Sequence, residues 1–209
     1  MPSPLKLVII SDTHGLHELL TIPDGDMLIH AGDMTEYGEL DEIKAFDDWL
    51  GTLPHKHKIV IAGNHEHCLE EHDGHLLFKN AIYLQHQAIT IEGIRFFGSP
   101  WQPFFHNMAF NLRRGQDLAE KWQQIPSDTD ILITHTPPFK YLDRVRSQWV
   151  GCEDLLKRVQ ELKPKLHIFG HIHESYGQEA NRHTLFVNAC SVLELDAPLN
   201  RPVVVSWPL

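Results

Sequence analysis

The sequence, 209 residues long, has few cysteines and no long hydrophobic run. Its three cysteines (Cys68, Cys152 and Cys190) lie far apart and form no Cys-x-x-Cys pair. This excludes a disulfide framework and a zinc knuckle, so we expect three buried or half-buried thiols. The apolar runs at residues 7–10 and 59–62 are far too short to cross a bilayer. The N-terminus shows no signal-peptide pattern, and a cytoplasmic protein is therefore expected.

Basic residues are also scarce, since 18 Lys and Arg stand against 28 Asp and Glu, a formal net charge of −10. This balance argues against binding of long nucleic acid, which requires a basic surface that displaces counterions. Internal repeats, low-complexity tracts and Gly/Ser linkers are missing too. We therefore expect a single domain over residues 1–209.

Histidine, in contrast, is abundant, with 16 copies, and the positions of these residues matter more than their number. Short apolar runs alternate with amphipathic helical stretches, which is typical of an α/β protein. Three helices are predicted: one over 42–50 with Asp41 as its N-cap and Gly51 at its end, one marked by Leu118, Trp122 and Ile125, and one marked by Leu155, Val159 and Leu162 and stopped by Pro164.

Five short apolar runs each lead into Asp, Asn or His, and these runs cover residues 5–10, 27–29, 59–62, 131–133 and 166–169. If they are mostly parallel strands of one sheet, their carboxyl ends share the edge where ligand sites of α/β sheets gather. Any one motif is weak evidence, but five in series favour a functional site over packing. That edge would bring together eight side chains: Asp12, His14, Asp33, Asn64, His65, His135, His171 and His173.

The donor chemistry of this set favours two divalent metal ions. Two Asp, one Asn and four of the His offer oxygen and imidazole ligands without a thiolate, which suits Mn²⁺, Fe or Zn²⁺. Two ions about 3.5–4 Å apart can hold the attacking and leaving oxygens of a phosphoryl displacement, with a bridging hydroxide as the nucleophile. The sequence has neither a G-x-S-x-G elbow nor a Walker A loop.

In their order along the chain, these motifs resemble the calcineurin-like metallophosphoesterase superfamily. The resemblance is closest to its metallophosphoesterase-domain-containing, class III phosphodiesterase-like subfamily, and it spans nearly the whole chain. The segments that carry it are 30–36 (HAGDMTE), 58–66 (KIVIAGNHE), 98–101 (GSPW), 164–170 (PKLHIFG) and 173–177 (HESYG). The resemblance implies a four-layer α/β/β/α sandwich, with the runs 94–97, 185–187 and 203–205 in its second sheet.

The resemblance also implies a role for each candidate side chain. His65 would be a catalytic residue beside the phosphate, where it stabilises charge and protonates the leaving alkoxide. The other seven would be metal ligands: Asp12, His14 and His173 for the first ion, Asn64, His135 and His171 for the second, and Asp33 for both.

The activity implied by the resemblance is hydrolysis of phosphodiesters with two divalent ions, Mn²⁺ being expected first and Fe or Zn²⁺ being the alternatives. Cyclic nucleotides are the leading substrate class, so the expected partner is a small phosphate ester rather than a membrane or a long nucleic acid. Some animal members of the subfamily carry Gly where this chain has His171, and its presence favours an enzyme over a nucleotide-binding module with little turnover. Protein Ser/Thr phosphatases have Asp-Arg where this chain has Glu36, and this difference disfavours protein phosphatase activity. A phosphomonoesterase and a nuclease are the alternatives among enzymes.

Other histidines close to these motifs have plainer interpretations. Three of them, His67, His72 and His75, are expected in a solvated loop. His30 and His167 lie within predicted strands, and we expect both to be hydrogen-bonded core residues.

Two further features allow a structural and a functional interpretation. Glu66 either orients His65 or faces solvent. The stretch 100–110 concentrates aromatic residues, for which core packing is the favoured explanation. The functional alternative is a substrate-binding wall in which Trp101 stacks on a nucleobase, next to Asn64 and His65 as further substrate contacts.

Overall fold

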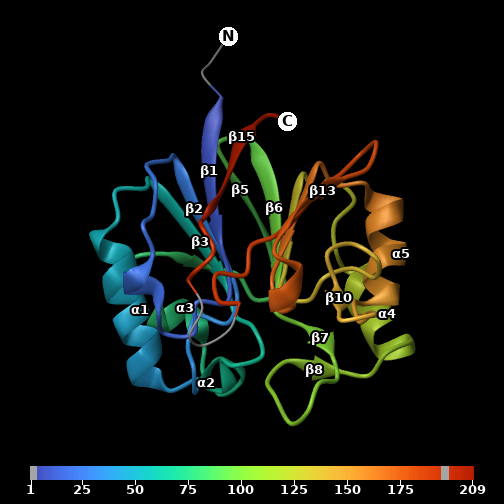
Figure 1. Ribbon diagram of the computed structural model, residues 1–209, viewed down its shortest axis with the longest axis horizontal. Helices are drawn as coiled ribbons and strands as arrows, with labels where there is room; N and C mark the ends of the chain where they lie inside the picture. The colour runs from blue at the N-terminus through green and yellow to red at the C-terminus, as the bar shows by residue number, and fades with distance from the viewer. Residues whose placement is uncertain (1–3, 194–197) are drawn as a thin grey trace.

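The computed structural model describes residues 4–193 and 198–209 and contains two main β-sheets that pack face to face (Figure 1). The strands of the first sheet, in spatial order, are β15 (Val203–Trp207), β1 (Leu5–Ile10), β2 (Met27–Ala31), β3 (His57–Ile61) and β4 (Ile82–Tyr83). The strands of the second are β13 (Gly177–Ala180), β14 (Leu185–Asn188), β12 (Leu166–Phe169), β9 (Ile131–Thr134), β6 (Ile94–Ser99) and β5 (Gln87–Ile91).

Each sheet has a parallel centre, with one antiparallel edge strand in the first sheet and two in the second. In the first sheet β1 to β4 are parallel and β15 is antiparallel to β1. In the second, β14, β12, β9 and β6 are parallel, while β13 and β5 are antiparallel edge strands. Two short pairs lie outside the sheets: β7 (Gln102–Pro103) with β8 (Asn111–Leu112), and β10 (Arg144–Val145) with β11 (Gln148–Trp149).

Helices cover the outer face of each sheet, so that the fold is a four-layer α/β/β/α sandwich (Figure 1). Helices α1 (Leu40–Thr52), α2 (His67–Glu71) and α3 (Gly74–Leu77) cover the first sheet, and α4 (Gln116–Gln123) and α5 (Glu153–Leu162) cover the second. Two single turns, η1 (His17–Leu19) and η2 (His173–Ser175), are 3₁₀ helices. Among the described residues, no helix has the length and apolar character that a membrane crossing demands.

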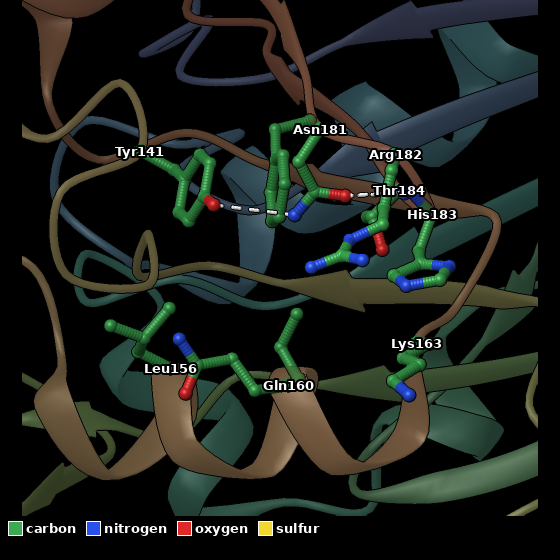
Figure 2. Close-up of a pocket in the computed structure, with 10 residues that line it drawn as sticks. Tyr141, Leu156, Gln160, Lys163, Asn181, Arg182, His183 and Thr184 are labelled. Atoms are coloured by element: carbon green, nitrogen blue, oxygen red, sulfur yellow. Dashed lines mark hydrogen bonds between the residues drawn. The ribbon is translucent and has the colours of Figure 1, made fainter.

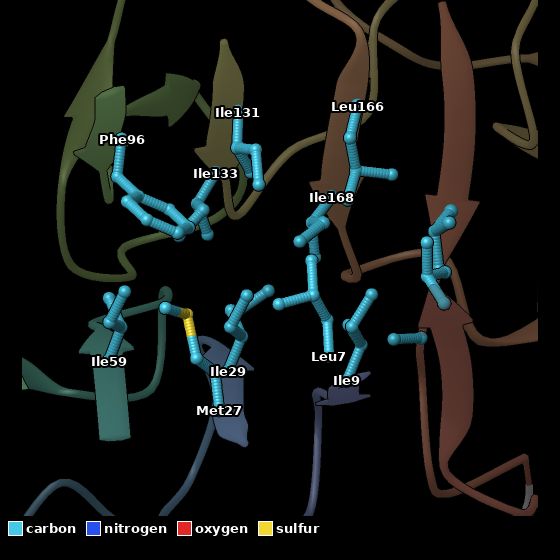
Figure 3. Packing of buried hydrophobic residues seen from close by; sticks show 14 of the residues in the cluster. Leu7, Ile9, Met27, Ile29, Ile59, Phe96, Ile131, Ile133, Leu166 and Ile168 are labelled. Atoms are coloured by element: carbon cyan, nitrogen blue, oxygen red, sulfur yellow. The ribbon is translucent and has the colours of Figure 1, made fainter. Parts of the chain in front are cut away.

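The core between the sheets follows from the alternation of side chains along each strand. Leu7 and Ile9 of β1 point toward the second sheet, where they meet residues such as Leu166 and Ile168 of β12 (Figure 3). Val8 of β1 points the other way and packs under the helices. Because both faces of the central strands are buried, their sequences are continuous apolar runs.

Two predictions about the strands are wrong in detail. The five strands that precede the candidate residues divide between two sheets, with β1, β2 and β3 in the first and β9 and β12 in the second. The run 203–205 belongs to β15 in the first sheet, where Val203 and Val205 are buried and Val204 is exposed. An apolar run predicts that a strand is buried, but it does not predict which other strand pairs with it, because the backbone hydrogen bonds that pair strands do not depend on side-chain identity.

The three predicted helices form, although one cap differs and Ile125, predicted in the second helix, lies buried just beyond the end of α4 at Gln123. Helix α1 begins at Leu40 rather than 42, because Glu39 and Glu42 form a reciprocal capping box that replaces the predicted Asp41 cap. Gly51 lies inside α1, which ends one residue later. Helix α5 ends before Lys163, which has a left-handed backbone (φ 52°) and precedes Pro164.

Candidate metal centre

The carboxyl ends of the parallel strands lie at one end of the sandwich, and the candidate residues follow them there. A pocket of about 570 Å³ opens at this end, and its lining includes His14, Asp33, Asn64 and His65 from the first sheet and His171 and His173 from the second. Asp12 and His135 are fully buried beside it. All eight side chains that the strand ends predicted are therefore gathered in one place, although they come from two sheets.

A first cluster of ligand atoms forms around Asp12, His14 and His173. The distance from Asp12 Oδ1 to His173 Nε2 is 3.4 Å, and that from His14 Nε2 to His173 Nε2 is 3.3 Å. Asp33 Oδ2 lies 4.0 Å from His14 Nε2. Ligand atoms of Asp12, His14 and Asp33 are all within 4.8 Å of one another, close enough to bind one ion.

A second cluster forms on the other side of Asp33. Its Oδ2 lies 3.3 Å from His135 Nε2, which in turn lies 2.9 Å from Asn64 Oδ1. Ligand atoms of Asp33, His135 and His171 also lie within 4.8 Å of one another. Asp33 thus belongs to both clusters, in the position where the resemblance implied a shared ligand.

The charges of the cluster fit divalent cations. Asp12 and Asp33 are buried, and histidines alone form ion pairs with them among the described residues. Buried carboxylates are costly unless cations compensate them. In addition, His14 Nε2 is turned toward Asp33 and His173, whereas its Nδ1 lies 3.7 Å from Glu36 Oε2. Oxygen and imidazole donors converging in this way are the ligand chemistry of Mn²⁺, Fe and Zn²⁺ sites.

Burial and charge act against each other in this cluster. Burial disfavours the Asp33 carboxylate, but the His135 imidazolium outweighs it and holds the pKa of Asp33 well below its ordinary value. Burial disfavours the charged form of His135 too, and the same carboxylate raises its pKa above the usual range. Burial lowers the pKa of His14, and it lowers the pKa of His171 to about 3, so both rings are neutral and able to coordinate a metal.

His65 is held in a fixed orientation at the pocket. Its backbone N–H donates to Asp33 Oδ1 at 2.9 Å, and its ring Nδ1–H donates to the carbonyl oxygen of Glu36 at 2.7 Å. Because a carbonyl can only accept, Nδ1 carries the proton and Nε2 is the ring nitrogen that a ligand can meet. The ring packs edge-on against His14, with centroids 4.5 Å apart.

The backbone is strained where several candidates sit. Asp12, His14, Asp33 and His171 all have positive φ angles, between 44° and 68°, which is uncommon for residues other than glycine and clusters at functional sites. Gly32, with φ +98°, lies so close to His135 that a Cβ there would be 2.6 Å from its Nδ1. This glycine is needed for the approach of the two sheets.

Glu66 has a role that the sequence did not predict. Its side chain is completely buried and forms no hydrogen bond with the His65 ring, whose Nδ1–H is bonded to the Glu36 carbonyl. It accepts hydrogen bonds from the backbone N–H groups of Asp33 (2.9 Å), Thr35 (3.0 Å) and Gly63 (2.6 Å), and from the Thr35 hydroxyl (2.7 Å). Glu66 therefore ties together the two loops that present Asp33 and Asn64.

The remaining histidines fall largely where they were predicted. His30 and His167 are fully buried in strands. Both ring nitrogens of His30 are hydrogen-bonded, whereas His167 bonds through Nε2 to the Thr134 hydroxyl and its Nδ1 has no partner in the described structure. His67, His72 and His75 are exposed, as expected, but His67 and His75 belong to α2 and α3 rather than to a loop.

Trp101 does not line the pocket. It is half-buried and packs edge-on against Phe110, with centroids 5.6 Å apart, so the packing explanation applies to it. The aromatic residues of the same stretch that do line the pocket are Phe104 and Phe105.

Sequence reasoning also missed a cysteine beside the ligands. All three cysteines are buried and free, as predicted, but the Cys190 thiol lies 3.2 Å from Asp12 Oδ2 and donates to it. Burial raises the pKa of this thiol, and the nearby carboxylate raises it further. A signal was present, because Cys190 follows the end of β14 as the other site residues follow their strands.

A second pocket, of about 410 Å³, lies between α5 and the turn that joins β13 to β14 (Figure 2). Its lining includes Gln160, Lys163, Asn181 and Arg182, and a hydrogen bond joins Asn181 to the Tyr141 hydroxyl. None of the eight candidate residues lines it. Of these two pockets, only the one at the strand ends is lined by candidate metal ligands.

The fold and the two ligand clusters define a metal-binding hydrolase of the calcineurin-like phosphoesterase family, and the chain belongs to that family. The family model matches residues 5–175. Members are phosphoesterases that typically bind two divalent metals.

Relatives cover nearly the whole chain. Metallophosphoesterase domain-containing protein 1 of Homo sapiens is 44% identical over 99% of this chain and 72% of its own length. UPF0046 protein K07C11.7 of Caenorhabditis elegans is 42% identical over 98% of this chain and 76% of its own. The solved structure of TT1561 of Thermus thermophilus shares the fold, with a TM-score of 0.61 and 15% identity over 89% of each chain.

Proposed function

We propose that the protein is a metal-dependent phosphodiesterase that acts on small nucleotide diesters, with cyclic nucleotides as the leading substrates. The observation that carries the proposal is the sharing of Asp33 by two clusters of metal-ligating groups. Two divalent cations, Mn²⁺ first and Fe or Zn²⁺ as alternatives, would supply positive charge beside a phosphate and lower the pKa of a water molecule. The residues that would hold them are Asp12, His14 and His173 for one, Asn64, His135 and His171 for the other, and Asp33 for both.

His65 is the residue to which we assign the proton transfer. With Nδ1–H bonded to the Glu36 carbonyl, an imidazolium at this position presents its second proton at Nε2. As the bond from phosphorus to the leaving oxygen breaks, that proton passes from Nε2 to the alkoxide, and the ring becomes neutral while Nδ1–H stays bonded. The hydrogen bonds of His65 thus set the nitrogen from which the proton leaves.

The size and charge of the pocket support a small substrate. Its volume of about 570 Å³ lies within the range of pockets for small molecules. Its lining contains Arg114 but no lysine, so it offers no basic track for a long polymer. The preference for diesters rests on the likeness of the motif segments to the class III phosphodiesterase-like subfamily.

The test is an activity panel on protein that is stripped of metal and then reconstituted with Mn²⁺, Fe²⁺ or Zn²⁺. We expect turnover of 2′,3′- or 3′,5′-cyclic AMP with metal, none with excess chelator, and lower kcat/KM for a phosphomonoester and an oligonucleotide. Binding of a nucleotide without turnover under every metal would contradict the proposal and favour a regulatory module.

His65→Ala separates the proton-transfer role from metal binding. We expect kcat to fall about 100- to 10,000-fold while the metal content measured by mass spectrometry is unchanged. His67→Ala is the matched control, because His67 is exposed and is not among the lining residues. A loss of metal in His65→Ala would show that the division of roles is wrong.

A further inference from the structure

Two large apolar side chains are exposed at the rim of the polar pocket. Phe104 and Phe105 keep 66% and 45% of their surface accessible, and both line the pocket that contains the metal-ligating groups. The Phe105 ring stands edge-on to the His171 ring at 90°, with centroids 5.5 Å apart. Exposed apolar residues that gather next to a polar site mark a surface that binds something.

The segment that carries these rings is fixed by hydrogen bonds. The Phe104 N–H donates to the carbonyl of Leu112 at 2.8 Å, which continues the pairing of β7 with β8. The Asn111 side chain accepts from the Phe105 N–H at 3.0 Å and donates to the carbonyls of Phe105 (3.3 Å) and His106 (3.1 Å). The backbone that carries both rings is thus held at the pocket before any ligand arrives, which lowers the entropic cost of binding.

A second apolar part of the lining comes from the hairpin of β10 and β11, which supplies Val145 and Val150. Arg114 lies two residues after β8 and links the two regions, since its guanidinium donates to the carbonyls of Gly151 (2.8 Å) and Val150 (2.6 Å). The hairpin is anchored in turn by Ser175, which accepts from the Arg144 N–H and donates to the Arg144 carbonyl, each at 2.9 Å. The pocket therefore has a polar, metal-ligating part and an apolar part built on two anchored segments.

We propose that Phe104 and Phe105 form a specificity subsite for a planar aromatic group, a nucleobase or an aryl ring, attached to the phosphate ester that the metal-ligating part receives. This proposal rests on the proposed function and names the substituent that the enzyme selects. Aromatic rings stack on such groups through dispersion and apolar contact, with an effect of about 5- to 150-fold in affinity per base.

The experiment compares substrates with and without the aromatic group. KM and kcat are measured for 2′,3′-cyclic AMP, for the 2′,3′-cyclic phosphate of 1-O-methylribose, which lacks the base, and for bis(4-nitrophenyl) phosphate. The proteins are the metal-loaded wild type, Phe104→Ala/Phe105→Ala, the ring-preserving Phe104→Tyr/Phe105→Tyr, and Leu76→Ala. Leu76 is 78% exposed on α3 and serves as the control for loss of an exposed apolar side chain.

In the double alanine variant we expect KM for cyclic AMP to rise about 5- to 150-fold with kcat within about twofold. KM for the base-free diester should change less than about twofold, and the tyrosine variant should behave as the wild type. A matching rise for bis(4-nitrophenyl) phosphate would show that the subsite accepts aryl groups in general, and no rise would show that it selects nucleobases. Equal changes for cyclic AMP and the base-free diester, or no change for either, would overturn the proposal.

A binding measurement separates this subsite from the proposed function. AMP is titrated into the metal-loaded wild type and the double alanine variant by calorimetry. If no ester is hydrolysed but AMP binds and its affinity falls at least about fivefold in the variant, the proposed function fails and the subsite stands. If cyclic AMP is hydrolysed but both proteins bind AMP equally and share one KM, the subsite fails and the proposed function stands.

Discussion

The two sheets bring different chemistry to the candidate centre. The first sheet supplies all the oxygen donors, and the second supplies imidazoles only. The donors from the first are Asp12, His14, Asp33 and Asn64, and those from the second are His135, His171 and His173. Each cluster combines carboxylates of one sheet with histidines of the other, so a bound cation would add a link between two layers that already meet through apolar side chains and through hydrogen bonds such as that of His135 Nδ1–H to the Ala31 carbonyl. The carboxylates of the first sheet are thereby stabilised by histidines of the second.

The change with the largest expected effect removes the carboxylate common to both clusters. Asp33→Ala should abolish metal binding and lower kcat/KM at least about 1000-fold, because it deletes a ligand of each ion. It should also destabilise the fold, since His135 and His14 lose their carboxylate partner. Metal content, kinetics and urea denaturation measure these effects. Asp48→Ala on the exposed face of α1 is the control. If Asp33→Ala retained both ions, the first sheet would not supply the ligand that the two clusters share.

Removal of metal tests whether the sheets are joined through the centre. Free ions at about 100 times their dissociation constant should raise the free energy of unfolding by about 2.7 kcal/mol per site. Urea denaturation of the wild type with Mn²⁺ and with excess chelator measures the difference. In Asp33→Ala the same two conditions should give equal stability. If the free energy of unfolding of the wild type is the same with Mn²⁺ and with chelator, no cation joins the sheets.

A substitution within the first sheet sharpens the comparison. Glu66→Gln should lower the free energy of unfolding by about 2 kcal/mol, because a carboxylate that accepts four hydrogen bonds is replaced by an amide that offers one oxygen and places an NH₂ group against buried donors. Glu71→Gln, on the exposed part of α2, should change the free energy by less than about 0.5 kcal/mol. If the two variants unfold alike, the loops of the first sheet do not depend on Glu66.

The effect that is smallest near neutral pH, and grows only as the pH falls, concerns the second sheet. Burial lowers the pKa of His167 to about 3, so between about pH 6.5 and 3 the unfolded chain takes up a proton that the folded protein does not. The free energy of unfolding should therefore fall, as the pH falls through this window, by up to about 1.4 kcal/mol per pH unit from this residue. Metal-free His167→Gln should lose that part of the slope, and His183→Gln, at an exposed position, should keep it. If the free energy of unfolding depends on pH with the same slope in the wild type and in His167→Gln, His167 does not contribute to that dependence.

Much of the site could be predicted from sequence, because apolar runs mark buried strands and a polar residue at the end of each run marks the functional edge. Asp12, Asp33 and His135 were found in this way. The division of the strands between two sheets could not be found from the residues, since Ile29 of β2 and Ile133 of β9 carry the same apolar signal and face the same core. That part of the architecture came from the family resemblance.

The predictions that were wrong concern side chains whose environment depends on segments far away in the sequence. Glu66 is a charged residue next to a turn, and its burial follows from backbone N–H groups of the Asp33 loop, about 30 positions earlier. In the stretch 100–110, composition shows that aromatics gather but not which of them turn inward. Trp101 packs on Phe110, while Phe104 and Phe105 stay at the pocket.

The left-handed backbone at Asp12, His14, Asp33 and His171 has an evolutionary consequence. At such a position a mutation to glycine deletes a metal donor and relieves backbone strain in the same step. The relief of strain therefore offsets part of the stability that is lost with the metal donor, whereas recovery requires a residue that coordinates a metal and tolerates the strained angle. At these four positions the backbone thus favours glycine while metal coordination favours Asp or His, so the two requirements oppose each other.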